Sequence, residues 1–419
     1  MQNSYAEYFP ELKVSTKQNI GLFILFFIWP FMALLMALRT YHRSESRSIT
    51  WLFLVFYGFT FIVASSGADS SRYAAYLISA RELPFSDFWV IISGVYAYEY
   101  NVDIFIHIIN FIVSRFTDNY HILFGVFAAI FGFFYIKSIN SLHDQYIWSR
   151  NHNALIFFLF FITIIPITGI NGFRFYTAAW VYFFGAYNYI FKNGGRGFLM
   201  VSLSSIFIHF SFISASIVLL LYVFTGNRNK IYLPIAIVSF LLPNLFNALL
   251  PQLGQTLGGG LEERISSYSD NDYILRRGKE IEQAKWFVQW NTRLVFYFMI
   301  FAVFYIRTKY RKAVSSIDAE NLYSFLLLFL AYTNFTGSIA SGSRFQVLFL
   351  LFSTVYVFLF FTRYRFVKIH LISLMGLIPI LLYVIFRLRV FASSASVWLF
   401  APLPFNFFGG EQSLESFIF

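Results

Sequence analysis

The chain has 419 residues, of which 58% are hydrophobic and only 12% carry a charge. So few charges exclude a soluble protein of this length, and several apolar runs reach the roughly 17–25 residues that cross a bilayer as a helix. The formal net charge of +11 is spread over the connections between these runs, which argues against nucleic-acid binding and agrees with basic cytoplasmic loops.

Long uninterrupted apolar runs predict an all-α protein, because the strands of a membrane β-barrel would alternate apolar and polar residues. We expect a polytopic transmembrane bundle of about 11–13 helices, with residues 1–419 forming a single membrane domain. The candidate spans are residues 20–38, 51–66, 120–136, 154–170, 175–191, 198–224, 231–250, 292–306, 322–339, 345–361 and 369–386.

Short connections rich in Lys and Arg are expected on the cytoplasmic side of the membrane. Their basic residues are Arg39, Arg43, Arg47, Lys137, Arg150, Lys192, Arg196, Arg228, Lys230, Arg307, Lys309, Arg311, Lys312, Arg363, Arg365 and Lys368. If all of these are inside, residues 69–119 stay outside and the short apolar segment 102–114 does not cross. Segment 198–224, which is basic at both ends, must then run toward the outer side of the membrane and return to the cytoplasmic side.

Segment 198–224 is too short for two complete spans. We therefore predict two short helices with a break near residues 208–211, beside His209, and irregular backbone at membrane depth implies a cavity lined by protein or water. In an alternative topology, segment 102–114 crosses and segment 198–224 is one tilted span. That alternative places the basic turn KNGGR (residues 192–196) on the outer side and so violates the positive-inside rule at one loop.

Under the first topology, polar residues from distant segments converge on the outer face. Ionisable residues that border apolar segments are candidates for a functional site, although an arginine there can also anchor the chain at the lipid headgroups. The polar insert 251–290 is predicted as an amphipathic extracytoplasmic loop, with a solvated connector as the alternative. The candidate residues are Asp69, Arg72, Tyr76, Glu99, Asp103, Arg174, His209, Arg344 and, in the insert, Arg276 and Arg277.

These residue types fit a phosphate carried by a lipid. Arginine binds phosphate through a planar, permanently charged fork, and Arg174 and Arg344 each begin a helix, where backbone N–H groups favour an anion. Asp69 and Glu99 are candidate general bases for a sugar hydroxyl, and His209 is a competing base. Nucleotide-binding and hydrolase motifs are absent, and the dispersed histidines predict neither a metal site nor a cofactor.

Several stretches resemble the EpsG-like polysaccharide polymerases, a branch of the Wzy-type O-antigen and capsule polymerases. The likeness covers most of residues 69–216, with a weaker echo at Arg344. One departure is Phe175, which follows the helix-opening arginine where the family often has glutamine. The stretches are GADSSRYAAY, YEYNVDIFIHIINFIV, NGFRFYTAAW, IFIHFSFI and SGSRF.

The resemblance implies a metal-independent glycosyltransferase embedded in the membrane. It would join oligosaccharide repeat units carried on undecaprenyl diphosphate at the outer side of the bacterial inner membrane, facing the periplasm or the exterior. Donor and acceptor glycans, membrane lipid and a chain-length regulator protein are the expected partners. Asp69, Glu99 and His209 are the catalytic candidates, and Arg174, Arg344, Arg72, Tyr76, Arg276 and Arg277 are the substrate-binding candidates. A glycan ligase, a flippase of lipid-linked oligosaccharide and a membrane acyltransferase stay open as alternatives.

Overall fold

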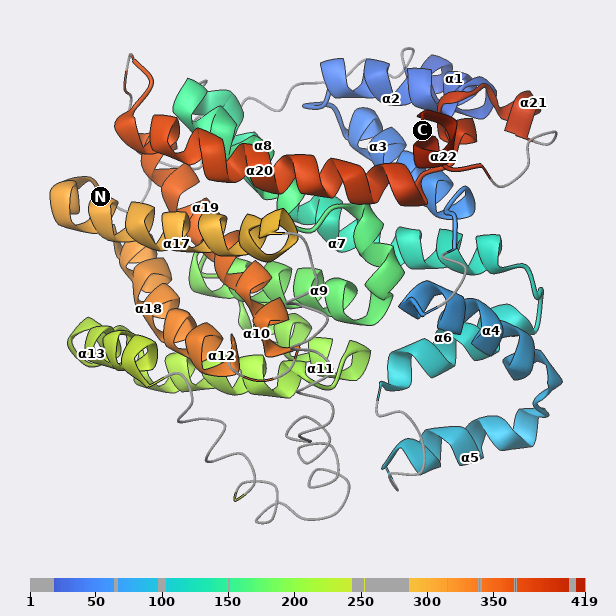
Figure 1. Ribbon diagram of the computed structural model, residues 1–419, viewed down its shortest axis with the longest axis horizontal. Helices are drawn as coiled ribbons and strands as arrows, with labels where there is room; N and C mark the ends of the chain where they lie inside the picture. Colours follow the sequence, from blue (N-terminus) through green and yellow to red (C-terminus); the bar gives the residue numbers. More distant parts are fainter. Residues whose placement is uncertain are drawn as a thin grey trace.

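The structure of the protein, a computed structural model, describes residues 19–63, 67–96, 103–149, 151–242, 252, 286–314, 316–337, 339, 341–364, 366, 368–406 and 412–418. Within these ranges the regular elements are helices (Figure 1), and strand-like pairing is limited to the isolated bridges Phe61–Ala395 and Ser396–Ser413. The prediction of an all-α polytopic fold is confirmed.

In chain order, the α-helices and the shorter 3₁₀ helices (η) are α1 (Asn19–Ile28), α2 (Pro30–Arg39), α3 (Ser44–Phe59), α4 (Asp69–Glu82), α5 (Phe85–Tyr96), α6 (Ile104–Ser114), α7 (Tyr120–Ser149), α8 (His152–Ile164), η2 (Ile167–Gly172), α9 (Phe173–Ile190), α10 (Arg196–Leu203), α11 (Ser205–Ile208), α12 (Phe212–Thr225), α13 (Asn229–Leu241), α17 (Trp286–Lys309), η3 (Arg311–Val314), α18 (Ile317–Gly337), η4 (Gly342–Phe345), α19 (Gln346–Arg363), α20 (Leu371–Ser394), η5 (Val397–Phe400), α21 (Leu403–Asn406) and α22 (Leu414–Ile418).

The first predicted span, residues 20–38, is two helices, α1 and α2. Pro30 separates them, because proline has no N–H to continue the hydrogen bonds of α1 and its fixed φ suits the first position of α2. The indole of Trp29, at the break, donates a hydrogen bond to the carbonyl oxygen of Phe400 at 2.8 Å. The break is therefore tied to the C-terminal part of the chain.

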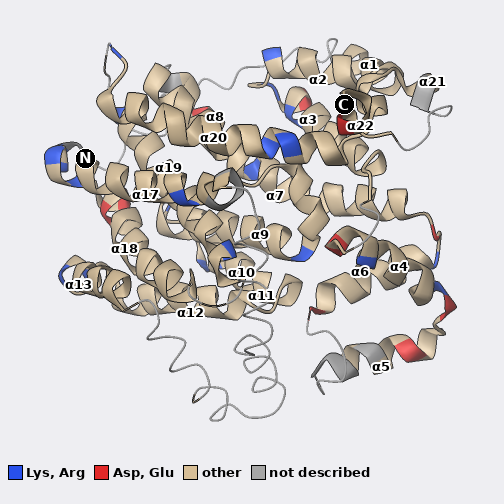
Figure 2. Cartoon of the chain, viewed as in Figure 1, with Lys and Arg blue, Asp and Glu red and all other residues tan. Residues whose placement is uncertain are grey.

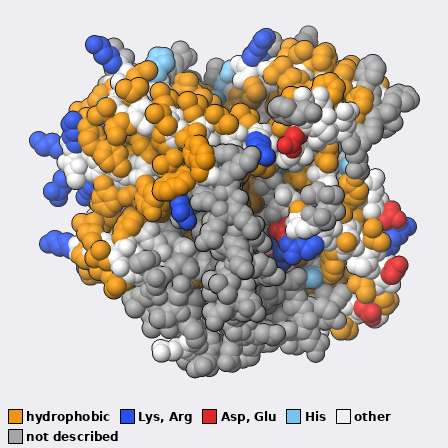
Figure 3. Space-filling view, in the orientation of Figure 1, with side chains coloured by type: hydrophobic (Ala, Val, Ile, Leu, Met, Phe, Trp, Pro, Cys, Tyr) orange, Lys and Arg blue, Asp and Glu red, His pale blue; other side chains and the backbone are white. Residues whose placement is uncertain are grey.

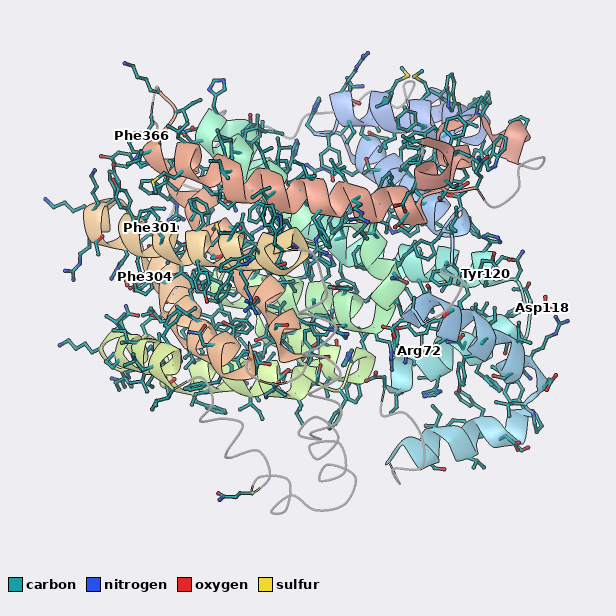
Figure 4. The ribbon with its side chains drawn as sticks, viewed as in Figure 1. Arg72, Asp118, Tyr120, Phe301, Phe304 and Phe366 are labelled. Atoms are coloured by element: carbon teal, nitrogen blue, oxygen red, sulfur yellow. The ribbon has the colours of Figure 1, made fainter. Side chains whose placement is uncertain are left out.

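Helices α4, α5 and α6 form a layer at one end of the bundle, on the right of Figure 1. α6 has 11 residues, which at 1.5 Å per residue is about half the thickness of the hydrocarbon core. Arg81 of α4 forms an ion pair with Asp118, which lies just before Tyr120 at the start of α7 (Figure 4). These short, mutually attached helices agree with the prediction that segment 102–114 does not cross the membrane.

A 3₁₀ turn, η2, joins α8 to α9. Pro166 stands at its start, where the missing N–H prevents α8 from continuing. At the opposite end of the two helices, Asn151 donates to a carbonyl oxygen at the end of α19 at 2.9 Å, and Asn321 of α18 donates to the carbonyl oxygen of Ile190 at 3.4 Å. The apolar stretch His152–Ile190 has 39 residues, about twice the length of one span, and thus makes two passes, as predicted.

Helices α10, α11 and α12 leave one end of the bundle and return to it. Before α10, Asn193 donates to Asp318 in the first turn of α18 at 3.3 Å; after α12, Asn227 donates to Asn321 in the next turn at 2.7 Å. Between them, helical hydrogen bonding stops at His209, whose φ of −146° and ψ of 115° are extended. The predicted break beside His209 is observed, and the segment turns back there.

The longest apolar stretches differ in how deeply they are buried. The apolar stretch that contains α19 is 89% buried, which makes α19 the central helix. The apolar stretch of α20 is only 28% buried, so α20 lies at the lipid-facing periphery. The protein is therefore a polytopic helical membrane protein. The stretches of the described residues that are long and apolar enough to cross a membrane are Tyr120–Ile147, His152–Ile190, Gly342–Arg363 and Leu371–Ser394.

Charged residues are unevenly distributed over the bundle. Figure 2 shows Lys and Arg at the left ends of α13 and α17, whereas Asp and Glu are more frequent on the right, around α4 to α6. On the face visible in Figure 3, a broad hydrophobic surface lies over the upper left. By the positive-inside rule, the left end is expected to face the cytoplasm.

Gly185 of α9 lies against the backbone of α10. A Cβ on Gly185 would stand 2.4 Å from the backbone nitrogen of Ser202, whereas the Cβ position of Gly197 in α10 has no neighbouring atom within 4 Å. We expect Gly185→Ala to destabilise the protein by about 1–3 kcal/mol, because two backbones must move apart. Gly197→Ala, the matched control, should be neutral or stabilising through its better helix propensity. Thermal unfolding in detergent, followed by tryptophan fluorescence, measures both, and equal midpoints would contradict this packing.

Candidate functional site

Arg174 stands in the first turn of α9 and is held by two neighbours. Its Nη1 donates to Oδ2 of Asp103 at 2.9 Å, and its Nε donates to the hydroxyl of Tyr73 at 3.2 Å. The side chains of Arg174 and Asp103 are 20% and 6% exposed, so the pair is largely shielded from water and each partner depends on the other. This guanidinium is fixed within the protein, unlike an arginine that only anchors the chain at the headgroups.

Asp103 connects three segments that are distant in sequence. It precedes the first residue of α6, and while one carboxylate oxygen binds Arg174, the other accepts a hydrogen bond from the backbone N–H of Phe210 at 2.7 Å. α6 also packs against α11. The start of α6, the start of α9 and the break before α12 are thereby joined through one carboxylate.

His209 occupies the break itself. The backbone N–H of Ser211 donates to its Nδ1 at 3.2 Å, and the Ser211 hydroxyl lies 3.0 Å from the same nitrogen. Oδ1 of Asp103 is 3.9 Å from Nδ1. Because Nδ1 accepts a backbone hydrogen bond, the neutral ring carries its proton on Nε2 and is a hydrogen-bond donor there.

Arg344 comes from a tight turn in the opposite half of the chain. Ser341 has a left-handed backbone with φ of 65°, and at Gly342 the chain passes so close to α18 that a Cβ would stand 1.9 Å from the carbonyl oxygen of Thr336. Only glycine fits this approach. The turn ends in η4, where Arg344 is exposed.

Aromatic packing brings this turn to the break. The ring of Phe345 lies 5.4 Å from that of Phe175 and 5.5 Å from that of Phe212, and Phe175 also contacts the imidazole of His209 edge-to-face at 5.6 Å. Phe345 is therefore the anchor that places Arg344 near His209. The charges that act on His209 are those of Asp103, Arg174, Arg344 and Asp69.

Asp69 opens α4 on the other side of Arg174. It forms an ion pair with the exposed Arg72, which Figure 4 labels. Its Oδ2 lies 3.8 Å from the position of a Cβ on Gly172, just before α9. Its charge also acts on Arg174 and Tyr73. Burial raises the pKa of Tyr73, so this phenol stays protonated at neutral pH.

The remaining predicted site residues are placed differently. The hydroxyl of Tyr76 is hydrogen-bonded to Nδ1 of His107 and so joins α4 to α6. Among the described residues, no cluster of three or more His, Asp or Glu side chains is suited to a metal ion. Glu99, Arg276 and Arg277, with most of the predicted loop, lie outside the described residues.

The structure brings together Asp69, Arg174, His209 and Arg344 from the predicted set. It adds two residues that the sequence left without a role, Asp103 and Tyr73. Asp103 had a usable signal, because an aspartate directly before an apolar helix is a typical N-terminal residue and stands in a stretch already singled out. Tyr73 also stands in such a stretch, GADSSRYAAY, but no pattern there distinguishes it from the other residues, and it is one of 28 tyrosines.

The site lies where apolar helices end and combines a shielded Arg–Asp pair with a second arginine and a histidine. A polytopic membrane protein with this arrangement is equipped to bind an anionic group presented from the bilayer. The chain belongs to the EpsG family, whose model matches residues 51–406. This membership confirms the suspected resemblance and indicates a polysaccharide polymerase in general. Comparison with curated proteins and with solved structures gave no match.

Ser211 tests the orientation of the site. The chain has no cysteine, so a single introduced thiol is labelled without background. We expect Ser211→Cys to react with a membrane-impermeant maleimide added to spheroplasts, because the break lies at the end of the bundle opposite the basic connections. Ser44→Cys, at the exposed first residue of α3, should react only after permeabilisation. The reverse labelling pattern would invert the topology.

Proposed function

We propose that the protein polymerises oligosaccharide repeat units, carried on undecaprenyl diphosphate, into an O-antigen, capsule or exopolysaccharide at the outer side of the bacterial inner membrane. The observation that carries this proposal is the Arg174–Asp103 pair, fixed at the break beside His209, where the charge of Arg344 acts on the same histidine. Membership of the EpsG family supports the general class of reaction.

In the proposed reaction, the bond between C1 of the donor sugar and the diphosphate oxygen breaks, and a bond from C1 to a hydroxyl oxygen of the acceptor glycan forms. The hydroxyl proton passes to a base, and undecaprenyl diphosphate leaves with the bonding electron pair. Negative charge grows on the leaving phosphate in the transition state, and cations already in place stabilise that charge without reorganisation. The residues of the site supply such cations, and the proposed step uses no metal.

Arg174 is suited to hold the diphosphate. Its hydrogen bonds to Asp103 and Tyr73 use two of the five N–H donors of a guanidinium. They set the plane of the fork, so little side-chain entropy is lost when phosphate oxygens bind to other donors. Arg344, which is exposed and has no ion pair among the described residues, supplies the second charge.

Asp69 is the better of the two described candidates for the general base. Its carboxylate lies beside Gly172 at the start of α9 and is partly exposed, as a group that meets an acceptor hydroxyl must be. His209 has its Nδ1 occupied by Ser211, so its neutral ring offers a proton from Nε2. We therefore assign His209 to hydrogen bonding of the leaving phosphate and Asp69 to the acceptor hydroxyl.

Purified protein in liposomes, incubated with an undecaprenyl-diphosphate-linked oligosaccharide of its host, tests the proposal. We expect a gel ladder spaced by one repeat unit, formed without nucleotide sugar and in the presence of EDTA. Transfer of glycan only to a different acceptor would indicate a ligase. Substrate that stays unchanged, with protein shown to be folded, would overturn the proposal.

A further inference from the structure

A third arginine, Arg387, lies inside an apolar helix close to the site and has no role in the reaction above. Arg387 belongs to α20, within the stretch Leu371–Ser394 that is long and apolar enough to span. Its Nη2 donates to the hydroxyl of Tyr383 at 2.5 Å, and its guanidinium carbon lies 4.7 Å from the centre of that ring. Tyr383 is fully buried and donates in turn to the carbonyl oxygen of Ile164 at 2.7 Å. This hydrogen-bond chain fixes the guanidinium against the end of α8.

The partners of Arg387 are neutral. Besides Tyr383, its side chain is hydrogen-bonded to Tyr176 of α9, and its buried Nε has no hydrogen-bond partner in the described part of the chain. Within the described residues, no carboxylate lies within ion-pair distance of Arg387 either. A permanently charged group at membrane depth is costly without a counter-charge. An anion from outside the chain would supply one.

Tyr176 places Arg387 next to the catalytic region. Tyr176 follows Arg174 by two residues, and its ring and the carboxylate of Asp69 both lie within 4 Å of the position of a Cβ on Gly172. α20 also packs on η2, which leads into α9. Arg387 and Arg174 therefore flank the same short turn, with Tyr176 on the Arg387 side and Asp69 on the Arg174 side.

The neighbouring surface of α20 is apolar and exposed. α20 runs across the front of the bundle beside α17 (Figure 1). Its outward side chains follow helical spacing, so they form one stripe that meets the lipid tails. A lipid tail lying along this stripe would bring its headgroup to the outer part of α20, where Arg387 stands. The exposed residues are Ile378, Leu381, Ile385 and Leu388.

We propose that Arg387, held by Tyr383 and Tyr176, is a second phosphate-binding position, at which a lipid diphosphate arriving along α20 is received before its phosphate reaches Arg174. This inference rests on the proposed function. The lipid tail follows the apolar stripe, the guanidinium takes the phosphate, and Tyr176 lies between the two arginines.

Arg387→Gln in full-length protein tests the site, with Arg389→Gln, an exposed arginine two residues further on the same helix, as the matched control. Two quantities are measured in nanodiscs: the dissociation constant of sugar-free undecaprenyl diphosphate, and KM and kcat of polymerisation. We expect Arg387→Gln to weaken binding and to raise KM by about tenfold, the usual effect of losing a charged hydrogen bond. The control should bind normally, and kcat should change less than KM. Arg387→Lys, which keeps the charge, should bind undecaprenyl diphosphate with intermediate affinity. This variant provides the test if the glutamine variant does not fold.

Unaltered binding of undecaprenyl diphosphate by folded Arg387→Gln would overturn the inference. So would loss of co-purifying phosphatidylglycerol with normal diphosphate binding, because Arg387 would then hold bulk anionic lipid. If the wild-type protein makes no polymer but binds undecaprenyl diphosphate through Arg387, the proposed function fails and the phosphate-binding position stands.

Discussion

Arg174→Ala is expected to reduce polymer formation at least about 100-fold, the scale on which removing one preorganised charge at a developing anion acts. The guanidinium is positioned by Asp103 and Tyr73 before substrate arrives, so its loss cannot be offset by a mobile side chain. The ladder assay with lipid-linked oligosaccharide measures the rate, and membrane fractionation shows that the variant protein is still inserted.

Two control variants separate charge from geometry. Arg174→Lys keeps the charge but cannot make both hydrogen bonds while also binding phosphate bidentately, so its rate should fall between those of wild type and alanine variant. Arg81→Ala removes an exposed arginine of α4 whose ion pair with Asp118 is at the surface, and such pairs contribute little. Normal polymer from Arg174→Ala, or an equal loss from Arg81→Ala, would contradict the assignment of Arg174.

The sequence was most informative where charge and length constrain the chain. Segment 198–224 is basic at both ends and too short for two spans, and these facts favoured a reversal near His209 over a single tilted span. The structure shows the reversal, with both ends hydrogen-bonded to the first turns of α18. The same charge argument predicted that segment 102–114, which contains α6, does not cross the membrane. The packing of α6 against α4 agrees with this prediction.

Contacts between distant segments could not be predicted from the sequence in the same way. No periodicity indicates that Asp103 binds both Arg174 and the N–H of Phe210, because these bonds depend on how three helix ends meet. The proximity of Arg344 to His209 depends on Phe345 packing against Phe175, and one aromatic pair is hard to identify among 58 phenylalanines.

Helix ends were also misjudged where a charge or a proline interrupts an apolar run. The last predicted span stopped at residue 386, just before Arg387, because a charged residue is a reasonable boundary of a membrane helix. α20 instead continues to Ser394, since Tyr383 and Tyr176 satisfy part of the hydrogen bonding of that arginine. Conversely, one predicted span was divided at Pro30, which starts a new helix.

Asp103→Asn is expected to lower both stability and polymer formation. The amide has the shape of the carboxylate and its oxygen can still accept from Phe210, but it no longer balances the charge of Arg174. Removing one partner of a shielded ion pair leaves the other charge uncompensated, at a cost of about 3–5 kcal/mol. Thermal unfolding in detergent and the ladder assay, run on the same preparation, measure the two losses. Unchanged values in both would contradict the pairing of Asp103 with Arg174.

The double variant Arg174→Gln with Asp103→Asn distinguishes the two roles of this pair. Without either charge, the Asn and Gln side chains can hydrogen-bond to each other, so the unfolding midpoint should recover toward wild type. Polymer formation should stay as low as in Arg174→Ala, because a neutral amide cannot stabilise the charge that grows on a leaving diphosphate. If the double variant regains activity with stability, the pair serves only to hold α6, α9 and the break together, and the cation of the reaction must be sought at Arg344.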